Sequence, residues 1–331
     1  MLNVAVTEQS QVAEARRAAV GIAQRLGFDE TAAGRVAIVA TELATNLVKH
    51  GGGGQLLAGP GEDPAGEAEV LLIAADKGRG MADVGGAMRD GMSTAGTAGN
   101  GLGAIRRQSH ALEIYSRPDA GTVIAAWLRA KRPSPVAARP WGAVALTHPN
   151  EEVSGDGYAV RHDGGASVVM VVDGLGHGPH AAEAATQAQR LFDKYWRQAP
   201  AELLDTLHAG LRSTRGAAVA VARIDPARRV VSYAGVGNIV GVIGAPGESK
   251  RLLSHNGTVG HVARKIHALD YPLPDAPSVL IMHSDGLGTS WSLDSYPGLV
   301  HAHPTLIATV LCRDFNRGRD DATALVLRAG A

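Results

Sequence analysis

Four acidic positions in the second half of the chain have surroundings typical of a metal-binding site. Asp173 follows an apolar run and opens the glycine-rich turn at 174–178. Asp156 lies in Ser-Gly-Asp-Gly, Asp285 in Ser-Asp-Gly, and Asp320 in Arg-Asp-Asp-Ala-Thr. A single aspartate at the end of a strand is most often a plain turn former, but four with this flanking chemistry are harder to explain in that way. Carboxylates in loops favour hard cations with oxygen ligands, so the pattern predicts a magnesium or manganese site if the four converge.

Many short strands and a few helices are expected to position these acids. The predicted strands are 141–146, 157–161, 167–172, 217–224, 230–234, 239–243, 277–283 and 322–327, and the predicted helices are 179–196, 203–212 and 304–314. Strands in this order, with two helices inserted after the first few, predict a β-sandwich flanked by helices. Asp173, Asp285 and Asp320 would each lie where a loop meets a strand, and Asp156 would lie in a turn before one.

The order and context of these acids resemble the metal-dependent serine/threonine phosphatase (PPM) superfamily, in its short bacterial SpoIIE/RsbX branch. The matching motifs are Asp-Gly-Leu-Gly-His-Gly at 173–178, Ser-Asp-Gly-Leu at 284–287 and Asp-Asp-Ala-Thr at 320–323. The resemblance implies that Asp173 bridges two Mn or Mg ions, with the Gly174 carbonyl as a backbone ligand. Asp285 and Asp320 would hold one of the ions, and Asp156 would support the pair directly or through water. Two close cations lower the pKa of a bridging water, which would attack a phosphoserine in line.

Some roles within this second half stay open. His177 is expected either to protonate the leaving serine oxygen or contact phosphate, or instead to cap the next helix. Larger relatives hold phosphate with an arginine near the first strand, but the equivalent stretch 147–157 contains none. Arg161 and Arg319 are only weak candidates for its replacement. Asp321 is the expected non-ligand of its pair, although the sequence does not decide between it and Asp320.

Three polar segments in the first 130 residues have the composition of a nucleotide site. Glu42 and Asn46 are four residues apart on a predicted helix and share one face of it. The segment 76–80, Asp-Lys-Gly-Arg-Gly, follows a predicted strand at 67–75, and a glycine-rich stretch at 90–103 runs into a further helix. Free N–H groups and the helix dipole make such a helix start suitable for phosphate. Alone, the polar helix face could equally be solvated.

The order of these segments resembles the GHKL ATPase fold, and most closely the switch serine kinases of the Rsb stress-response modules. The resemblance implies that Asp76 bonds the adenine amino group of ATP and that Asn46 coordinates a magnesium ion bridging the phosphates. Glu42 would be the base that activates a substrate serine. The glycines Gly78 and Gly80 would let the base approach the backbone, and Gly99, Gly101 and Gly103 would wrap the phosphates. Lys77 and Arg79 depart from the family pattern in the adenine loop.

Composition limits the alternatives. Lys+Arg and Asp+Glu are both 32 in 331 residues, a formal net charge of +0, which argues against nucleic acid or an anionic membrane as the main partner. The single Cys312, in an apolar helical stretch, excludes an internal disulfide framework and fits a reducing compartment. No long apolar run or secretory leader pattern is found, so a cytoplasmic protein is expected. Oligomeric state is not decided.

The domain organisation and function follow from these observations. A Pro-rich connector at 131–140 is the predicted boundary between an ATP-binding, serine kinase-like domain at 1–130 and a phosphatase domain at 141–331. The expected class is α+β: a GHKL-type α/β sandwich followed by a PPM-type β-sandwich flanked by helices. The first hypothesis is a phosphatase fused to a kinase, acting on phosphorylated STAS-domain antagonist proteins. The alternatives are a phosphatase whose first domain docks partners or senses nucleotide, and a non-enzymatic anti-sigma-type binding protein.

Overall fold

The chain forms two compact units in a computed structural model. The structure describes residues 1–62, 66–88, 101–131, 139–263 and 266–329. Unit 1 is Met1–Arg139 and unit 2 is Pro140–Ala331. Both units mix helices with strands, so the predicted α+β class with two domains is confirmed.

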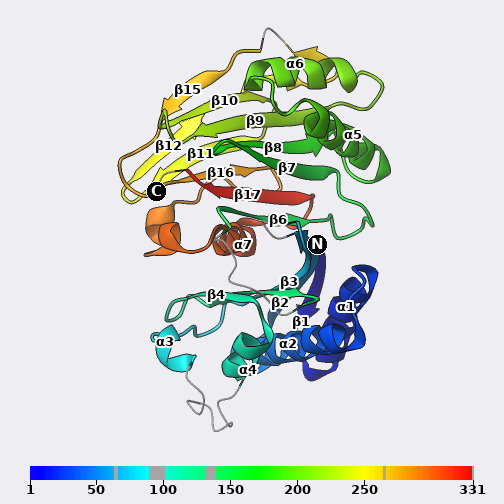
Figure 1. The fold of residues 1–331 in the computed structure, drawn as a ribbon, viewed down its shortest axis with the longest axis vertical. Helices are drawn as coiled ribbons and strands as arrows, with labels where there is room; N and C mark the ends of the chain where they lie inside the picture. Colours follow the sequence, from blue (N-terminus) through cyan, green and yellow to red (C-terminus); the bar gives the residue numbers. More distant parts are fainter. Residues whose placement is uncertain (63–65, 89–100, 132–138, 264–265, 330–331) are drawn as a thin grey trace. The chain divides into compact units, whose positions relative to one another are not determined.

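Unit 1 is a single sheet with helices on one face (Figure 1). Its elements are β1 Leu2–Val6, α1 Gln9–Arg25, α2 Glu30–Lys49, β2 Gly54–Glu62, β3 Ala68–Ala75, α3 Val84–Ala87, α4 Gly101–Gln108, β4 Ala111–Ser116 and β5 Thr122–Arg129. The strand order is β1-β2-β3-β5-β4, and neighbouring strands are antiparallel. The apolar stripes of α1 and α2 pack on this sheet, and Ile105 brings α4 into the same core.

The ends of helix α2 are fixed by its own sequence. Asp29 is the N-cap, and its Oδ1 accepts a hydrogen bond of 2.7 Å from the backbone of Ala32. At the other end His50 is the C-cap, and Gly53 donates from its backbone to the carbonyl of Leu47 at 2.9 Å. This helix carries Glu42 and Asn46, so its fixed length sets where both side chains stand.

Unit 2 contains two sheets of five strands each and a two-stranded pair. Its elements are β6 Trp141–Leu146, β7 Asp156–Asp163, β8 Ala166–Gly174, α5 Pro179–Tyr195, α6 Pro200–Gly210, β9 Ala217–Asp225, β10 Val230–Val236, β11 Val240–Ala245, β12 Glu248–Leu252, β13 Gly257–Thr258, β14 Val262–Ala263, β15 Leu269–Pro272, β16 Val279–His283, the 3-10 turns Leu293–Ser295 and Leu299–His301, α7 Pro304–Phe315 and β17 Ala322–Arg328. The sheets run β15-β10-β9-β8-β7 and β12-β11-β16-β17-β6.

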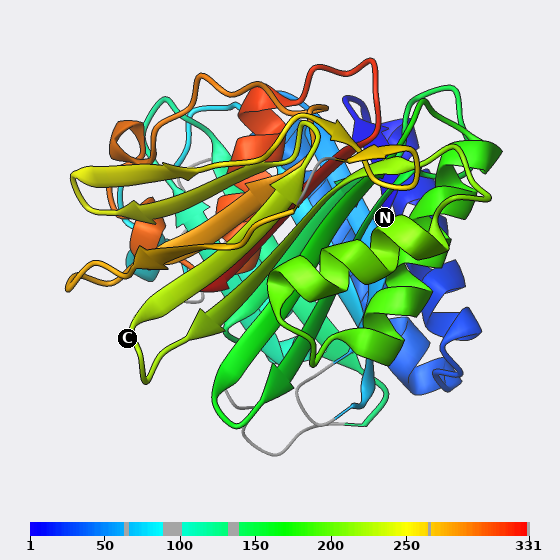
Figure 2. The same cartoon turned by 90° about the horizontal axis from the view of Figure 1, so that it is seen from above.

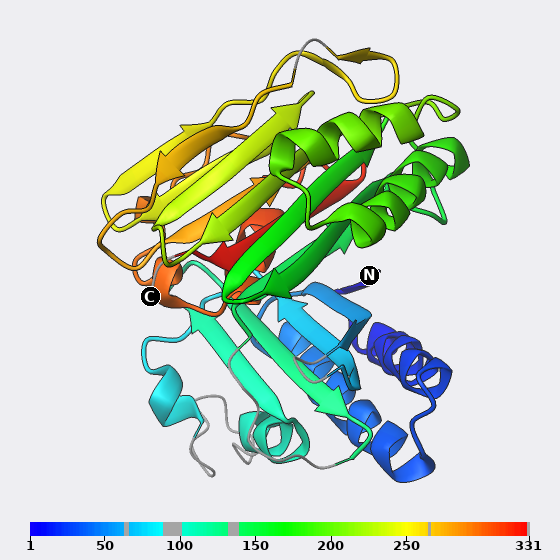
Figure 3. The same cartoon turned by 45° about the horizontal axis from the view of Figure 1, so that its top comes forward.

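Strand β8 shows why the two sheets form a sandwich. Val169 and Val171 point to one side, into a core shared with Leu280 of β16 and Leu325 of β17 in the other sheet. The intervening residues of β8 point to the opposite side, into a core shared with α5 and α6, which cover that face of the sheet (Figures 2 and 3). A strand buried on both faces reads as a continuous apolar run. Helix α7 packs on β6 and β17 of the second sheet.

The strand register places the acids at one end of the sandwich. In the antiparallel pair of β7 and β8, Asp156 lies directly opposite Asp173. In the neighbouring sheet, β16 ends at His283 and β17 begins at Ala322, so the ends that lead to Asp285 and Asp320 are adjacent. No helix in the described ranges is long and apolar enough to cross a membrane.

Candidate functional site

Three of the four predicted acids line one hollow in unit 2. Asp173, Asp285 and Asp320 face a hollow of about 470 Å³, whose other lining residues include Asn238 and Thr258. Asp173 comes from the end of β8 in one sheet, whereas Asp285 and Asp320 come from loops at the end of the other. The hollow therefore lies where the two sheets meet, with carboxylates contributed by both.

Asp156 lies beneath this hollow rather than on its wall. It is 8% exposed, and its Oδ2 accepts a hydrogen bond of 2.5 Å from the hydroxyl of Ser284. Ser284 also accepts a bond from the backbone of Thr323 at 3.0 Å, which ties Asp156 to the loops at the ends of β16 and β17. Asp156 is therefore buried beside the wall of the hollow and fixed by the loops at the ends of β16 and β17.

The aspartates around the hollow repel one another, because several carboxylates lie close together in a partly buried place. Burial, followed by repulsion from Asp321 and Asp320, raises the pKa of Asp156 to about 7, although the Ser284 hydrogen bond opposes the rise. Burial, followed by repulsion from Asp156 and Asp285, raises the pKa of Asp173 to about 8. Each carboxylate disfavours ionisation of the others in the absence of a cation. A bound divalent cation would relieve this repulsion.

The donor chemistry fits a hard cation, but a finished ligand group is not formed. Carboxylate oxygens are the ligands that Mg²⁺ and Mn²⁺ prefer. Across the parts of the chain that the structure describes, no three His, Cys, Asp or Glu side chains form a group that could hold a metal ion as they stand. The fit therefore rests on the four carboxylates, their shared end of the sandwich and their mutual repulsion.

Asp321 binds backbone N–H groups, whereas its neighbour Asp320 faces the hollow. Asp321 is 3% exposed, and its two carboxylate oxygens accept backbone hydrogen bonds from His148 at 2.8 Å and Gly155 at 2.7 Å. Both bonds hold the loop that leads into Asp156. Asp320 instead faces the hollow, and its Oδ1 accepts a bond of 2.9 Å from the backbone of Asp321.

His177 lies on the surface beside a carboxylate. Its Nδ1 is 2.6 Å from Oε1 of Glu151, and its ring stacks on that of His148 with centroids 4.8 Å apart. Gly178, and not His177, is the N-cap of α5. The alternative that His177 caps this helix is therefore not what the structure shows, and its ring is held by Glu151 instead.

Two glycines of this region are required by close backbone approach. A Cβ on Gly174 would lie 2.2 Å from the carbonyl oxygen of Ala181, so only glycine lets α5 come this near to the end of β8. Gly174 also donates from its backbone to the carbonyl of Gly155 at 2.9 Å. Gly286 packs in the same way, because a Cβ there would lie 1.9 Å from the carbonyl oxygen of Asp321.

Ser284 and Asn238 each hold one of the acids in place. Ser284 is completely buried and bonds Asp156, while the side-chain amide of Asn238 donates to Oδ2 of Asp285 at 2.7 Å. The sequence contains a hint of the Ser284 contact, because Ser284 immediately precedes Asp285. Nothing in the sequence indicates that Asn238, from the turn before β11, reaches Asp285.

In unit 1 the structure brings Glu42 and Asn46 to the start of α4. A Cβ on Gly101 would lie 3.0 Å from Oε2 of Glu42 and 3.7 Å from Oδ1 of Asn46. The absent side chain at Gly101 thus lets the first turn of α4 come close to the carboxylate of Glu42 and the amide of Asn46. Gly103 is buried within the same helix. Gly99, with the rest of the glycine-rich stretch up to residue 100, lies outside the described residues.

The Asp76 loop is held by backbone contacts. Oδ1 of Asp76 accepts hydrogen bonds from the backbone of Gly78 at 2.9 Å and of Thr122 at 3.2 Å. A Cβ on Gly78 would lie 2.7 Å from the Cα of Gly51. A Cβ on Gly80, whose φ is +61°, would lie 1.8 Å from the carbonyl oxygen of Arg117. These two glycines therefore pack the loop against its own neighbours, a role that the sequence did not predict.

These two sites agree with comparisons to known protein families. Residues 163–330 match the family model of stage II sporulation protein E (SpoIIE), and residues 5–127 match the histidine kinase-like ATPase domain. The chain belongs to the SpoIIE family, and the region matched to that family is preceded by an ATPase-like domain. The predicted two-domain resemblance is confirmed.

The curated relatives correspond to the two units separately. The serine/threonine-protein kinase RsbT of Bacillus subtilis is 32% identical over 128 residues, which are 38% of this chain and 96% of RsbT. The phosphoserine phosphatase RsbX of the same organism is 26% identical over 145 residues, 43% of this chain and 71% of RsbX. The chain thus joins an RsbT-like kinase domain to a SpoIIE/RsbX-type serine phosphatase domain.

A solved structure shares its fold with more than half of this chain. It comes from work described as "The bacterial stressosome: a modular system that has been adapted to control secondary messenger signaling". It is 24% identical, has a TM-score of 0.53, and covers 57% of this chain and 98% of its own. At this identity the likeness concerns the fold alone.

Proposed function

We propose that unit 2 is a metal-dependent phosphoserine/phosphothreonine protein phosphatase. The observation that carries this is the placement of Asp173, Asp285 and Asp320 around one hollow, with Asp156 buried behind Asp173. Two Mn or Mg ions are assigned to Asp173, the Gly174 carbonyl, Asp285 and Asp320. Bound divalent cations would supply an activated water for in-line attack on a phosphoester and would offset phosphoryl charge.

The remaining residues of unit 2 orient these acids. Ser284 holds Asp156, Asn238 holds Asp285, and Asp321 holds the loop before Asp156. Hydrogen bonds of this kind fix the direction of a ligand and keep its lone pairs aimed at the ion. His177 is assigned the proton donor to the leaving serine oxygen. Its contact with Glu151 supports this, because the carboxylate holds the imidazole ring in one orientation at the surface.

Hydrolysis of an aryl phosphate by the intact chain tests this proposal. Activity is expected with Mn²⁺, to disappear with a chelator, and to fall at least about 100-fold in Asp173→Asn, since even outer-sphere partners of a metal change activity by 10–100-fold. Asp205→Asn is the matched control, because Asp205 is exposed on α6. Equal rates in the wild type and Asp173→Asn would remove the phosphatase proposal.

We propose that unit 1 binds ATP with magnesium. The close approach of Gly101, at the start of α4, to Glu42 and Asn46 supports this assignment together with the match to an ATPase domain. Asn46 is assigned to the magnesium ion, and Asp76 to the adenine. The glycines assigned to the nucleotide are Gly78, Gly80, Gly99, Gly101 and Gly103.

We propose serine kinase activity as a second function, carried by unit 1. Glu42 stands beside the first turn of α4, the helix start assigned to phosphate, where a carboxylate can orient a serine hydroxyl for phosphoryl transfer. The proposed parts are 1–130 for the kinase-like domain, 131–140 for the connector and 141–331 for the phosphatase. The proposed substrates are STAS-domain antagonist proteins, phosphorylated by one part and dephosphorylated by the other, because the relatives RsbT and RsbX are a kinase and a phosphoserine phosphatase.

Transfer of labelled phosphate from ATP to a STAS-domain protein tests the kinase. The Asp173→Asn chain is used, so that unit 2 does not remove the product, and Glu42→Ala is added to it. Loss of transfer with Glu42→Ala, but not with Glu14→Ala on the exposed side of α1, supports the kinase. ATP binding without Glu42-dependent transfer leaves a nucleotide-sensing or docking role for unit 1. Absence of both activities leaves the non-enzymatic binding protein.

A further inference from the structure

The hollow in unit 2 lacks positive charge of its own. Its described lining residues include the carboxylates of Asp173, Asp285 and Asp320 and no Lys or Arg. A phosphoserine side chain carries about −1.5 to −2 charges at neutral pH. A guanidinium matches phosphate oxygens with a planar pair of donors, so an arginine at the rim would orient such a group.

Arg215 is the arginine that the structure places at this rim. A Cβ on Gly176, which lines the hollow, would lie 3.5 Å from Nη1 of Arg215. Gly176 has a φ of +86°, so a side chain is disfavoured there and the approach to Arg215 stays open. Arg215 is exposed, and among the described residues no hydrogen bond or ion pair of its guanidinium is found.

The turn that carries Arg215 is fixed in place. Gly216 accepts a backbone hydrogen bond of 3.0 Å from Leu175, next to Gly176, and donates at 3.0 Å to the hydroxyl of Thr214. The carbonyl of Thr214 is 3.1 Å from Nε2 of His261. Arg215 therefore stands on a backbone tied to the same loop that follows Asp173, and only its side chain needs to be ordered when a ligand arrives.

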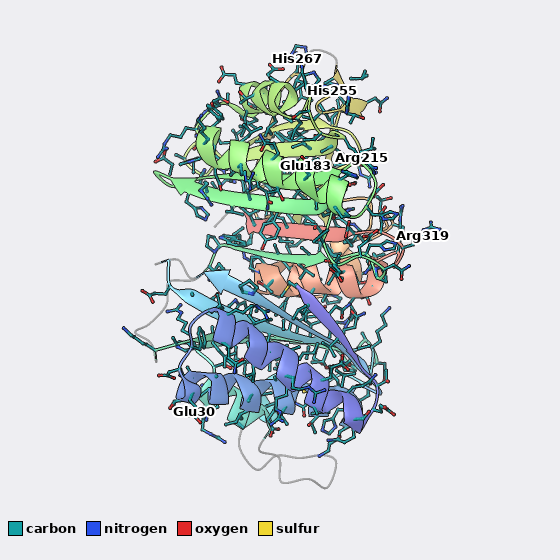
Figure 4. The ribbon with its side chains drawn as sticks, turned by 90° about the vertical axis from the view of Figure 1, so that its right-hand side faces the viewer. Glu30, Glu183, Arg215, His255, His267 and Arg319 are labelled. Atoms are coloured by element: carbon teal, nitrogen blue, oxygen red, sulfur yellow. The ribbon has the colours of Figure 1, made fainter. Side chains whose placement is uncertain are left out.

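The other two arginines are placed less well. Arg161 pairs with Asp193 at 2.7 Å and lies five residues along β7 from Asp156, roughly 16 Å at the rise of a strand. Arg319 is exposed in the loop before Asp320. Figure 4 shows Arg215 and Arg319 toward the same edge of unit 2 in that view. Of these three arginines, Arg215 is the one whose guanidinium approaches Gly176 of the hollow.

We infer that Arg215 binds the phosphoryl group of the substrate at the hollow. This inference rests on the proposed phosphatase function. Its guanidinium donates to phosphate oxygens, orients the phosphoester over the carboxylates and reduces repulsion between the acids and the incoming dianion. Arg215 takes no part in holding metal or in proton transfer, so its loss weakens binding of phosphate more than it slows a bound substrate.

Kinetics and phosphate binding of the intact chain in Mn²⁺ test this assignment. Arg215→Ala is expected to raise KM for a phosphoserine peptide, and the inhibition constant of inorganic phosphate, about 10- to 100-fold, the range that a hydrogen bond to a charged group provides. Arg215→Lys is expected to be intermediate, because it keeps the charge and loses the planar pair. Calorimetric titration of inorganic phosphate into Asp173→Asn, with and without Arg215→Ala, gives a readout without turnover.

The controls separate the outcomes. Arg212→Ala, at an exposed residue of the same turn, is expected to leave KM and phosphate binding unchanged, and the single arginine variants are expected to keep the wild-type melting temperature. Constants for Arg215→Ala equal to those of Arg212→Ala would overturn the inference, as would an effect found with Arg319→Ala in its place. Hydrolysis by the wild type shows that the phosphatase proposal stands in either case. Absence of hydrolysis by the wild type would overturn both.

Discussion

Replacing Asp321 with asparagine tests whether this aspartate stabilises the fold through hydrogen bonds, as distinct from Asp320, which is assigned to the metal. The side chain keeps its shape, but one oxygen that accepts a backbone N–H becomes an NH₂ group. One of the two bonds, from His148 or from Gly155, is then lost, and two donors face each other. Because Asp321 is 3% exposed, water cannot readily replace the lost acceptor.

The size of the effect follows from these contacts. Loss of a hydrogen bond to a charged group costs about 1.5–3 kcal/mol, and a buried donor left without a partner adds about 1–3 kcal/mol. Removing the charge of Asp321 also lessens its repulsion of Asp156 and Asp173, which offsets part of the loss. A net loss of about 2–4 kcal/mol is expected. In a unit of this size that lowers the melting temperature by roughly 5–15 °C.

Thermal unfolding of Asp321→Asn and Asp320→Asn, each with and without Mn²⁺, measures the difference. Asp321→Asn is expected to melt earlier under both conditions and to keep Mn²⁺-dependent stabilisation. Asp320→Asn is expected to melt near the wild type without Mn²⁺, and to lose both that stabilisation and hydrolytic activity. The reasoning is refuted if Asp321→Asn keeps the wild-type melting temperature without Mn²⁺ but loses its response to the metal.

Three further predictions concern other parts of the chain. Gly101→Ala places a Cβ 3.0 Å from Oε2 of Glu42, so a fluorescent ATP analogue should bind less tightly by about tenfold or more, while stability is unchanged or raised because alanine favours a helix. Burial lowers the pKa of His110, and the backbone N–H of Arg129 donates to its Nδ1, so the neutral ring is favoured. Its contribution to stability is present above an ordinary pKa of about 6.5 and is lost as the pH falls below it, a dependence that urea unfolding should show in the wild type and not in His110→Gln. Burial raises the pKa of Cys312 to about 12, so an alkylating reagent near pH 8 should modify it only on unfolding, and rapid labelling of the folded chain would contradict this.

Strands with strong apolar patterns were predictable, and strands rich in glycine were not. The run that forms β8 was found to within two residues at each end, because burial on both faces gives a continuous apolar stretch. Strand β2, Gly54–Glu62, was missed, since its glycines and Pro60 read locally as a loop. Its pairing with β1 on one side and β3 on the other supplies the order that its own sequence lacks.

The sequence indicated which acids matter but not how they are held. Glycine-flanked aspartates could be found from local spacing, because a strand end and a turn are local features. The contacts of Asp156 with Ser284, separated by 128 positions, and of Asp285 with Asn238, separated by 47, depend on how the two sheets pack. The approach of Arg215 to Gly176 is of the same kind, since it depends on the turn before β9 lying beside the end of β8.

The placement of the acids in both sheets has a thermodynamic consequence. Asp173 belongs to one sheet and Asp285 and Asp320 follow the other, so a ligand held by all three can bind only when the sandwich is closed. Such a ligand links the two sheets. Because it binds only the folded unit, raising its concentration raises the free energy of unfolding by mass action. Occupancy of the site can therefore be read from resistance to heat or protease, with no chemistry taking place.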